Sequence, residues 1–105
     1  MTDMVGIYIT FWAKPGKIDD LVAALQAMAP TAAEESGTLV YGFHRVTGEL
    51  EGVSAYEIYT DAKAQQVHLG SVAVERLMAA LPDILGAAPE RFDLVPLAGG
   101  KGLPF

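Results

Sequence analysis

The side chains in this sequence that could do chemistry are two histidines, a glutamate inside an apolar run and a set of aromatic residues. His68 is the leading candidate for a base, because an imidazole has a reference pKa of about 6.5 and can accept a proton near neutral pH. Glu57 lies among apolar neighbours, where loss of hydration raises the pKa of a carboxyl. We expect both to be catalytic, with Glu57 either orienting His68 or acting as the base itself, on a substrate that carries an acidic proton.

Each of these residues also has a purely structural interpretation. His68 could pack in the core or cap a helix through a hydrogen bond to a backbone carbonyl. Glu57 could form an ion pair with Arg45 across a hairpin, or contact a second subunit. His44 lies on the opposite strand face from Tyr41, which favours an interface or edge contact and argues against a metal site shared with His68.

Four aromatic residues are candidates for the wall of a substrate pocket: Trp12, Tyr41, Phe43 and Tyr59. Their rings could contact an aromatic substrate, and the two tyrosine hydroxyls could donate hydrogen bonds to it. The alternative is that these rings fill the core or a subunit interface. A cavity of roughly 300 Å³ or more, enough for two fused rings, would favour ligand chemistry over packing.

The strands that would position these residues follow from runs rich in β-branched and aromatic side chains. Such runs predict strands over residues 5–13, 38–46, 53–59 and 91–97. The turn between the second and third runs is short and polar, so these two strands form an antiparallel hairpin. Each strand then places alternate residues on opposite faces of the sheet.

Two helical segments are predicted by apolar residues that recur at helical spacing. The first has Pro15 in its first turn and extends to Ser36–Gly37. The acidic pair Glu34–Glu35 near its end is expected to be solvated. The second segment begins at the capping residues Thr60–Asp61 and is interrupted near Gly70–Ser71.

This order of elements, β-α-β-β-α-β, predicts an α+β fold of the ferredoxin-like kind, in a single domain over residues 1–105 with a tail at 98–105. Helices would then cover only one face of the antiparallel sheet. Both faces of the first strand are largely apolar, so the second face also needs a cover. We therefore expect a homodimer in which two sheets pack back to back as a dimeric α+β barrel.

Composition argues against several classes of function. The net charge is −6 and the seven Lys and Arg residues are scattered, so we expect no nucleic-acid partner and no membrane binding. The sequence has no Cys, which rules out thiolate chemistry, and we expect neither a metal nor another cofactor. The N-terminal residues show no basic stretch followed by an apolar run, and no run reaches the roughly 18 residues of a membrane span. The cytoplasm is the expected location.

Short motifs follow one another along the chain: Lys14-Pro15-Gly16-Lys17, Glu35-Ser36-Gly37 followed by Tyr41, Glu57-Ile58-Tyr59, and Ala62–Leu69 with His68. In this order and spacing they resemble the antibiotic biosynthesis monooxygenase family over residues 5–97. The resemblance implies a dimeric α+β barrel. It implies, as activities, the oxidation of quinols or anthrone-like polyketides without metal or flavin, or the degradation of haem. It also favours Tyr41 and Tyr59 as pocket residues, because they occupy family-like positions.

The sequence departs from this family where chemistry would take place. It contains no Asn, although haem-degrading and anthrone-oxidising members both use one. His68 stands where the haem-degrading members have Trp, and Met78 stands where they have His, so haem binding or degradation is the weakest expectation. We expect a cofactor-independent monooxygenase acting with dioxygen on a small aromatic, quinol or polyketide-like substrate. The alternative is a non-catalytic ligand-binding or regulatory dimer.

Overall fold

The computed structural model describes residues 3–105, which form one antiparallel sheet and a layer of helices. The elements are β1 (Val5–Trp12), α1 (Ile18–Gln26), α2 (Ala29–Glu34), β2 (Thr38–Val46), β3 (Gly52–Tyr59), α3 (Ala62–Leu69), α4 (Val72–Ala80), the 3₁₀ turn η1 (Leu81–Asp83) and β4 (Glu90–Leu94). The strand order is β2-β3-β1-β4. This is the ferredoxin-like α+β fold that the sequence predicts.

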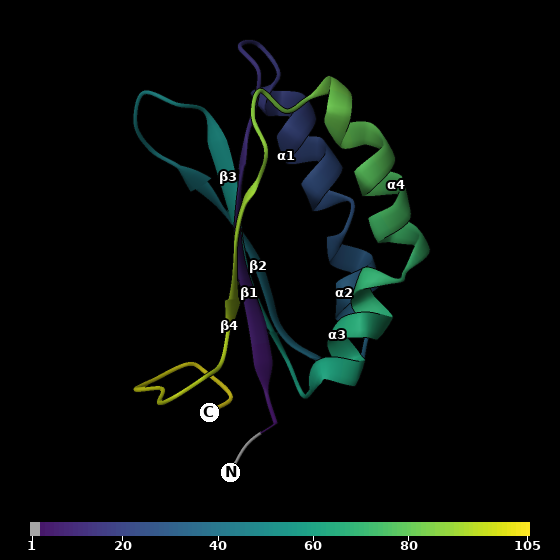
Figure 1. The fold of residues 1–105 in the computed structure, drawn as a ribbon, viewed down its shortest axis with the longest axis vertical. Coiled ribbons are helices and arrows are strands. Elements are labelled where there is room, and N and C mark those ends of the chain that lie inside the picture. Colours follow the sequence, from purple (N-terminus) through teal and green to yellow (C-terminus); the bar gives the residue numbers. More distant parts are fainter. Residues whose placement is uncertain (1–2) are drawn as a thin grey trace.

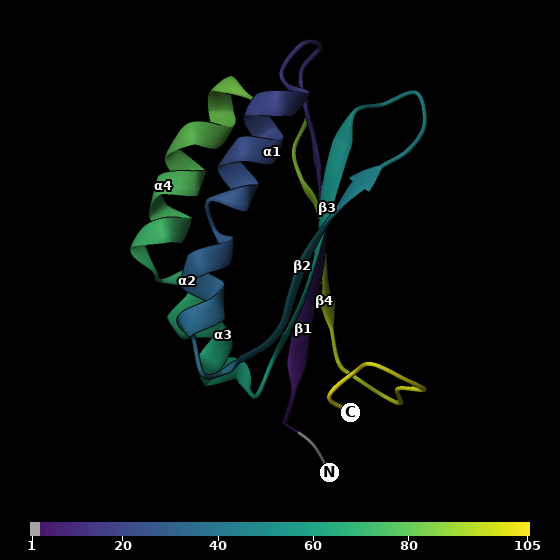
Figure 2. The same ribbon diagram turned by 180° about the vertical axis from the view of Figure 1, so that it is seen from behind.

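The helices lie on one face of the sheet (Figures 1 and 2). Buried apolar side chains of both layers form the core between them. Leu21 and Leu25 of α1 are almost completely buried, and they pack with Phe11 of β1 and Val53 of β3. These residues belong to the apolar stripe and to the strand alternation, so the hydrophobic pattern of the sequence determines which face the helices cover.

The first helical segment differs from the prediction in where it begins and in being divided into two helices. Pro15 precedes α1 and occupies a tight turn closed by a hydrogen bond from the Lys17 N–H to the Lys14 carbonyl, in which Gly16 has φ +80°. A proline followed by a glycine with positive φ is typical of a type II turn. The segment is also split in two, because Pro30 has no N–H to bond the carbonyl of Gln26, where α1 ends.

The later elements follow the prediction more closely. Asp61 caps α3 by accepting a hydrogen bond from the Ala64 N–H at 2.8 Å, and Ser71 caps α4 by accepting one from the Val74 N–H at 3.2 Å. The last strand is shorter than predicted, since it ends at Leu94.

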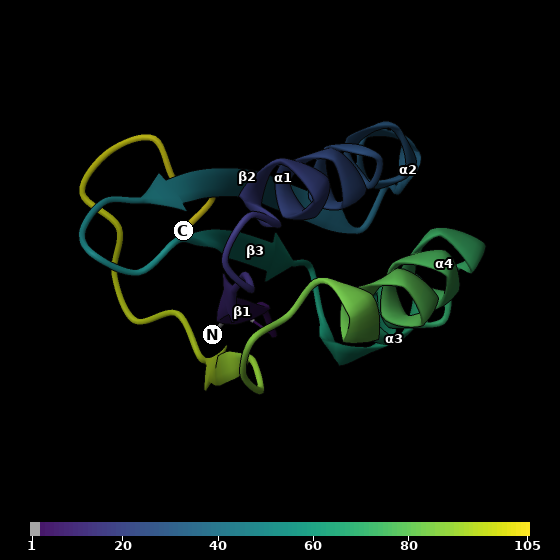
Figure 3. The same cartoon turned by 90° about the horizontal axis from the view of Figure 1, so that it is seen from above.

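In the described part of the chain, no helix lies over the second face of the sheet (Figure 3). Tyr8 and Phe92 are opposed on β1 and β4, and they are 41% and 61% exposed. The β2–β3 loop and the segment after β4 both extend on this side, away from the helices (Figures 1 and 3). No helix within residues 3–105 is long and apolar enough to cross a membrane.

Candidate active site

His68 lies in the last turn of α3 and faces the sheet. The residue is 2% exposed, and its ring lies close to those of two tyrosines. The ring centroids are 5.0 Å from that of Tyr41 on β2 and 5.5 Å from that of Tyr59 on β3. The Asp61 cap fixes where α3 begins, and His68 follows two helical turns later, so local capping helps to position the imidazole.

Glu35 fixes the orientation of the imidazole. Its Oε1 lies 2.6 Å from Nδ1 of His68, and the Thr38 hydroxyl donates to the same oxygen at 3.1 Å. A carboxylate at Nδ1 favours the tautomer that carries its proton there, which leaves Nε2 as the basic nitrogen. The sequence predicts a solvated helix end at Glu34–Glu35, and for Glu35 this prediction is wrong. The partner of Glu35 is far along the chain, and no local pattern indicates the contact.

Glu57 lies on β3 beside the basic nitrogen. Its Oε1 is 3.8 Å from Nε2 of His68, and it accepts a hydrogen bond from the hydroxyl of Tyr59. Burial raises the pKa of the Glu57 carboxyl, while the Tyr59 hydrogen bond and the nearby imidazole partly oppose the rise. Burial therefore disfavours the charged form of this carboxyl, which lies next to the imidazole.

The ion pair with Arg45 that was one structural alternative for Glu57 is not formed. Arg45 lies opposite Val53 on the hairpin, and its Nη2 is 3.5 Å from a carboxylate oxygen of Glu51. Glu57 lies opposite Tyr41 instead, on the face that the helices cover. The register of the hairpin therefore directs Glu57 to His68.

The raised pKa of Glu57 predicts a particular dependence of stability on pH. The folded protein holds this proton more tightly than the unfolded chain, whose carboxyl keeps its usual pKa of 4.5. The free energy of unfolding due to Glu57 therefore falls as pH rises from 4.5 to the raised pKa, and is level above it. Urea unfolding across this range will show a smaller fall in Glu57→Gln than in the wild type.

The matched control for this prediction is Glu51→Gln, which removes an exposed carboxylate just before the same strand. It will leave the pH dependence close to that of the wild type. An equal slope in Glu57→Gln and the wild type would contradict the assignment of the raised pKa to Glu57.

Glu35 gives a second prediction, on stability. Glu35→Ala leaves the buried Nδ1–H of His68 without its acceptor, which costs about 1–3 kcal/mol of unfolding free energy. Glu34→Ala changes the neighbouring exposed carboxylate and will cost less than about 0.5 kcal/mol. Urea unfolding of both variants at pH 7 measures the difference. Equal stabilities of the two variants would show that the Glu35–His68 contact contributes little.

Two tyrosines supply hydroxyl donors next to the pair. Burial is the main cause that raises the pKa of Tyr41 and of Tyr59, with nearby Glu57 adding to the effect. Both phenols therefore stay protonated at neutral pH. The Tyr41 ring also contacts Phe43 edge to face, with centroids 5.1 Å apart.

A cavity of about 170 Å³ lies between the sheet and the helices, over these groups. Tyr41, Phe43, Glu57 and His68 line it, together with apolar side chains of β1, α1 and α4. It is smaller than the roughly 300 Å³ that two fused rings would need, so the cavity does not reach the size that would by itself favour ligand chemistry over packing.

Trp12 does not line this cavity. It lies at the end of β1 with its side chain against Gly52, on the face that the helices leave uncovered. Strand alternation accounts for this placement, because Ile7, Ile9 and Phe11 line the cavity and Trp12 has the opposite parity. Tyr59 also lies outside the lining, behind Glu57, where its hydroxyl bonds the carboxyl.

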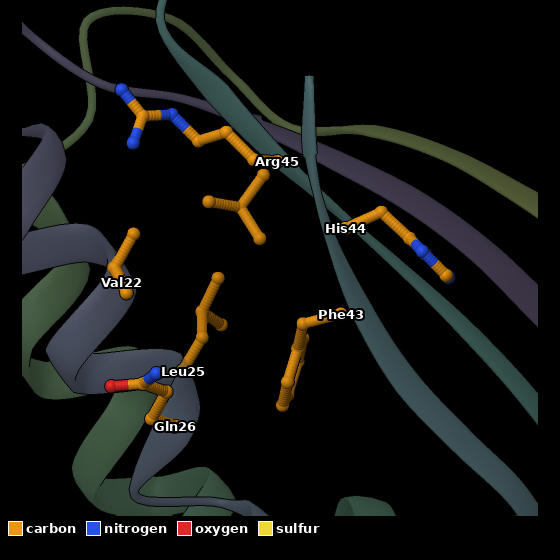
Figure 4. A pocket seen from close by; sticks show the side chains of 7 residues that line it. Val22, Leu25, Gln26, Phe43, His44 and Arg45 are labelled. Carbon is orange, nitrogen blue, oxygen red and sulfur yellow. The ribbon is translucent and has the colours of Figure 1, made fainter. Parts of the chain in front are cut away.

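A second hollow, of about 240 Å³, lies between α1 and the edge strand β2 (Figure 4). Val22, Leu25 and Phe43 point toward it, while the His44 side chain points away from them. His44 and Arg45 are exposed, and none of the lining residues is a buried polar group. This hollow therefore lacks the buried base and donors that the first cavity has. Within residues 3–105, no group of three or more His, Asp or Glu residues could hold a metal ion.

Comparison with known proteins adds to this description. The sequence model of the antibiotic biosynthesis monooxygenase family matches residues 4–80. No functionally curated protein matches the sequence. Among solved structures, Rv0793 from Mycobacterium tuberculosis is similar with a TM-score of 0.86 and 22% identity, over 93% of this chain and 99% of that one.

Two further structures have the same fold. PA3566 from Pseudomonas aeruginosa has a TM-score of 0.85 at 22% identity, over 93% of this chain and 98% of its own. A protein from Caulobacter crescentus, named as a candidate antibiotic biosynthesis monooxygenase, has a TM-score of 0.85 at 24% identity, over 92% of both chains. The TM-scores establish the shared fold, and the match to the family model over most of the sequence establishes the family. The chain belongs to the antibiotic biosynthesis monooxygenase family.

Proposed function

We propose that this protein is a cofactor-independent monooxygenase that oxidises a small hydroquinone-type aromatic compound with dioxygen. The observation that carries the proposal is the group formed by His68, Glu57 and Tyr41. It places a base, a carboxyl with a raised pKa and a protonated phenol on the wall of one apolar cavity. This chemistry requires few other catalytic groups, because the deprotonated substrate itself donates the electrons to dioxygen.

The first step is removal of a proton from the substrate hydroxyl by Nε2 of His68. Glu35 holds the opposite ring nitrogen and stabilises the imidazolium that forms. The Tyr41 hydroxyl donates a hydrogen bond to the resulting phenolate, in a largely buried part of the cavity. The phenolate is electron-rich enough to pass an electron to dioxygen.

The overall reaction balances without a further reductant. One oxygen atom of dioxygen enters a ring C–H bond, which becomes C–OH, and the other leaves as water. Hydroxylation of the ring supplies two electrons, and oxidation of the hydroquinone to a quinone supplies the other two. The product is a hydroxyquinone, and the two hydrogens lost from the substrate appear in the water.

The protein would act as a homodimer. The uncovered face of the sheet carries exposed aromatic side chains, among them Tyr8 and Phe92, and two loops extend beside it. A second copy of the chain packed on this face would bury these rings. The dimeric barrel that the family resemblance implies supports this arrangement.

The proposed function is tested by oxygen uptake with purified protein and methylhydroquinone, without added metal or cofactor. With ¹⁸O₂, mass spectrometry will find one labelled oxygen atom in the hydroxyquinone product. A rate no higher than that of autoxidation with denatured protein would refute the oxygenase. Saturable binding of the hydroquinone without product would instead identify a ligand-binding or regulatory protein.

A further inference from the structure

The cavity has a cationic side chain at its mouth. Of the residues that line it within the described part of the chain, Arg91 on β4 is the one Lys or Arg. The exposed lining residues Met78, Pro89 and Arg91 mark the opening, whereas Glu57 and His68 lie at the buried end. An apolar chamber thus connects a base to a guanidinium.

The register of the sheet sets the distance between Glu57 at the buried end of the cavity and Arg91 at its mouth. Glu57 pairs with Ile7 on β1, and Arg91 pairs with Ile9 two residues further along the same strand. With strands about 4.8 Å apart and about 6.6 Å between residues two apart, the Cα atoms of Glu57 and Arg91 are separated by roughly 12 Å. One substituted ring and a side-chain contact at each end can bridge this span.

The volume of the cavity also fits one ring. An apolar cavity of about 150 Å³ in another protein accommodates benzene, so about 170 Å³ holds a single six-membered ring with small substituents. A second fused ring would have to extend through the opening. The size favours monocyclic substrates over the anthrone-like compounds suggested by the family resemblance.

Arg91 is available for a ligand at the mouth of the cavity, and its charge also acts on the Glu57 carboxyl, where it partly opposes the rise in pKa caused by burial. Its Nε and Nη2 are 3.1 and 2.8 Å from Oδ1 of Asp93, but both side chains are exposed, and such pairs contribute little. An arginine can bind a carboxylate with two parallel hydrogen bonds. The chain as a whole has a net charge of −6, so an anionic substrate needs a local cation of this kind to enter.

From this arrangement we infer the class of substrate: a single-ring hydroquinone that carries an anionic substituent, such as a carboxylate, held by Arg91 at the mouth of the cavity. The inference rests on the proposed function for its chemistry, because the hydroxyl at the buried end is the one that His68 deprotonates. The anionic group takes no part in the reaction, whose atoms and electrons balance as above. Its contact with Arg91 orients the ring so that a hydroxyl faces His68.

The test compares 2,5-dihydroxybenzoate with methylhydroquinone, a neutral ring of similar size, by oxygen uptake. The wild type will have the higher kcat/KM for the carboxylate. Arg91→Gln will lower the ratio of the two kcat/KM values by roughly 10- to 100-fold, as expected for the loss of a charge-assisted hydrogen bond. Arg76→Gln is the matched control, because Arg76 is an exposed arginine of α4 that does not line this cavity. It will leave the ratio unchanged.

A wild type that oxidises both compounds equally, with a ratio that Arg91→Gln leaves unchanged, would overturn the inference and leave the oxygenase standing. If neither compound is oxidised, the proposed function fails, and binding of the non-oxidised analogue 3-hydroxybenzoate tests Arg91 alone by calorimetry. A Kd at least tenfold higher in Arg91→Gln than in the wild type would uphold the anion site. Equal Kd values, or no binding to the wild type, would overturn it.

Discussion

Replacing His68 with Gln will lower kcat for hydroquinone oxidation by roughly 10²- to 10⁴-fold, which is the usual contribution of a positioned general base. Gln is the informative substitution, because its amide can still donate a hydrogen bond to Glu35 but cannot accept a proton at neutral pH. Oxygen uptake at saturating substrate measures kcat directly. A loss in kcat rather than in KM is expected, since the proton is removed in the reaction and not on binding.

His44→Gln is the matched control for this experiment. His44 is the other histidine of the chain, and it is exposed on the far face of β2. The control will retain the rate of the wild type, and near-UV circular dichroism of both variants checks that the fold is intact. A rate of His68→Gln within threefold of the wild type would remove His68 from the mechanism.

The fold was predictable because its signals are local. The helix caps and the apolar stripe both act over one or two helical turns. The capping oxygens belong to Asp61 and Ser71, and the stripe includes Leu21 and Leu25. The errors were local as well. Pro15 is compatible with either a helix start or a type II turn, and the glycine that follows it decides for the turn.

The site was predictable in part. Strand alternation is enough to place Glu57 on the same face as Ala55, and helix periodicity is enough to make His68 a candidate to face the sheet. Trp12 fails the same test, because its parity puts it on the other face. Glu35 could not be found from the sequence, since its contact with His68 depends on how α2 and α3 come together in three dimensions. The size of the cavity likewise depends on packing that no local pattern encodes.

Phe92→Glu will prevent the proposed homodimer from forming at micromolar concentration. Phe92 is opposed to Tyr8 on neighbouring strands, and both rings are exposed in the single chain. If a second copy covers this face, a carboxylate at position 92 would be buried without a partner, which costs several kcal/mol for each subunit. A dissociation constant at least 100-fold higher than that of the wild type is expected from such a cost.

Sedimentation velocity distinguishes dimer from monomer. The protein is measured between roughly 0.5 and 50 μM, the range in which an interface of standard size would be expected to hold the dimer together. Val67→Glu is the matched control, because Val67 is a comparably exposed apolar residue, 62% against 61% for Phe92, but it belongs to α3 on the helical side of the sheet. That variant will sediment as the wild type does.

The cavity lies between the sheet and the helices of one chain, so a monomeric Phe92→Glu variant is expected to retain it. The oxidation rate of this monomer then shows whether the second copy is needed for the chemistry. A wild-type protein that sediments as a monomer over this whole range would show that the exposed rings have no second copy to cover them, and the barrel would have to be abandoned.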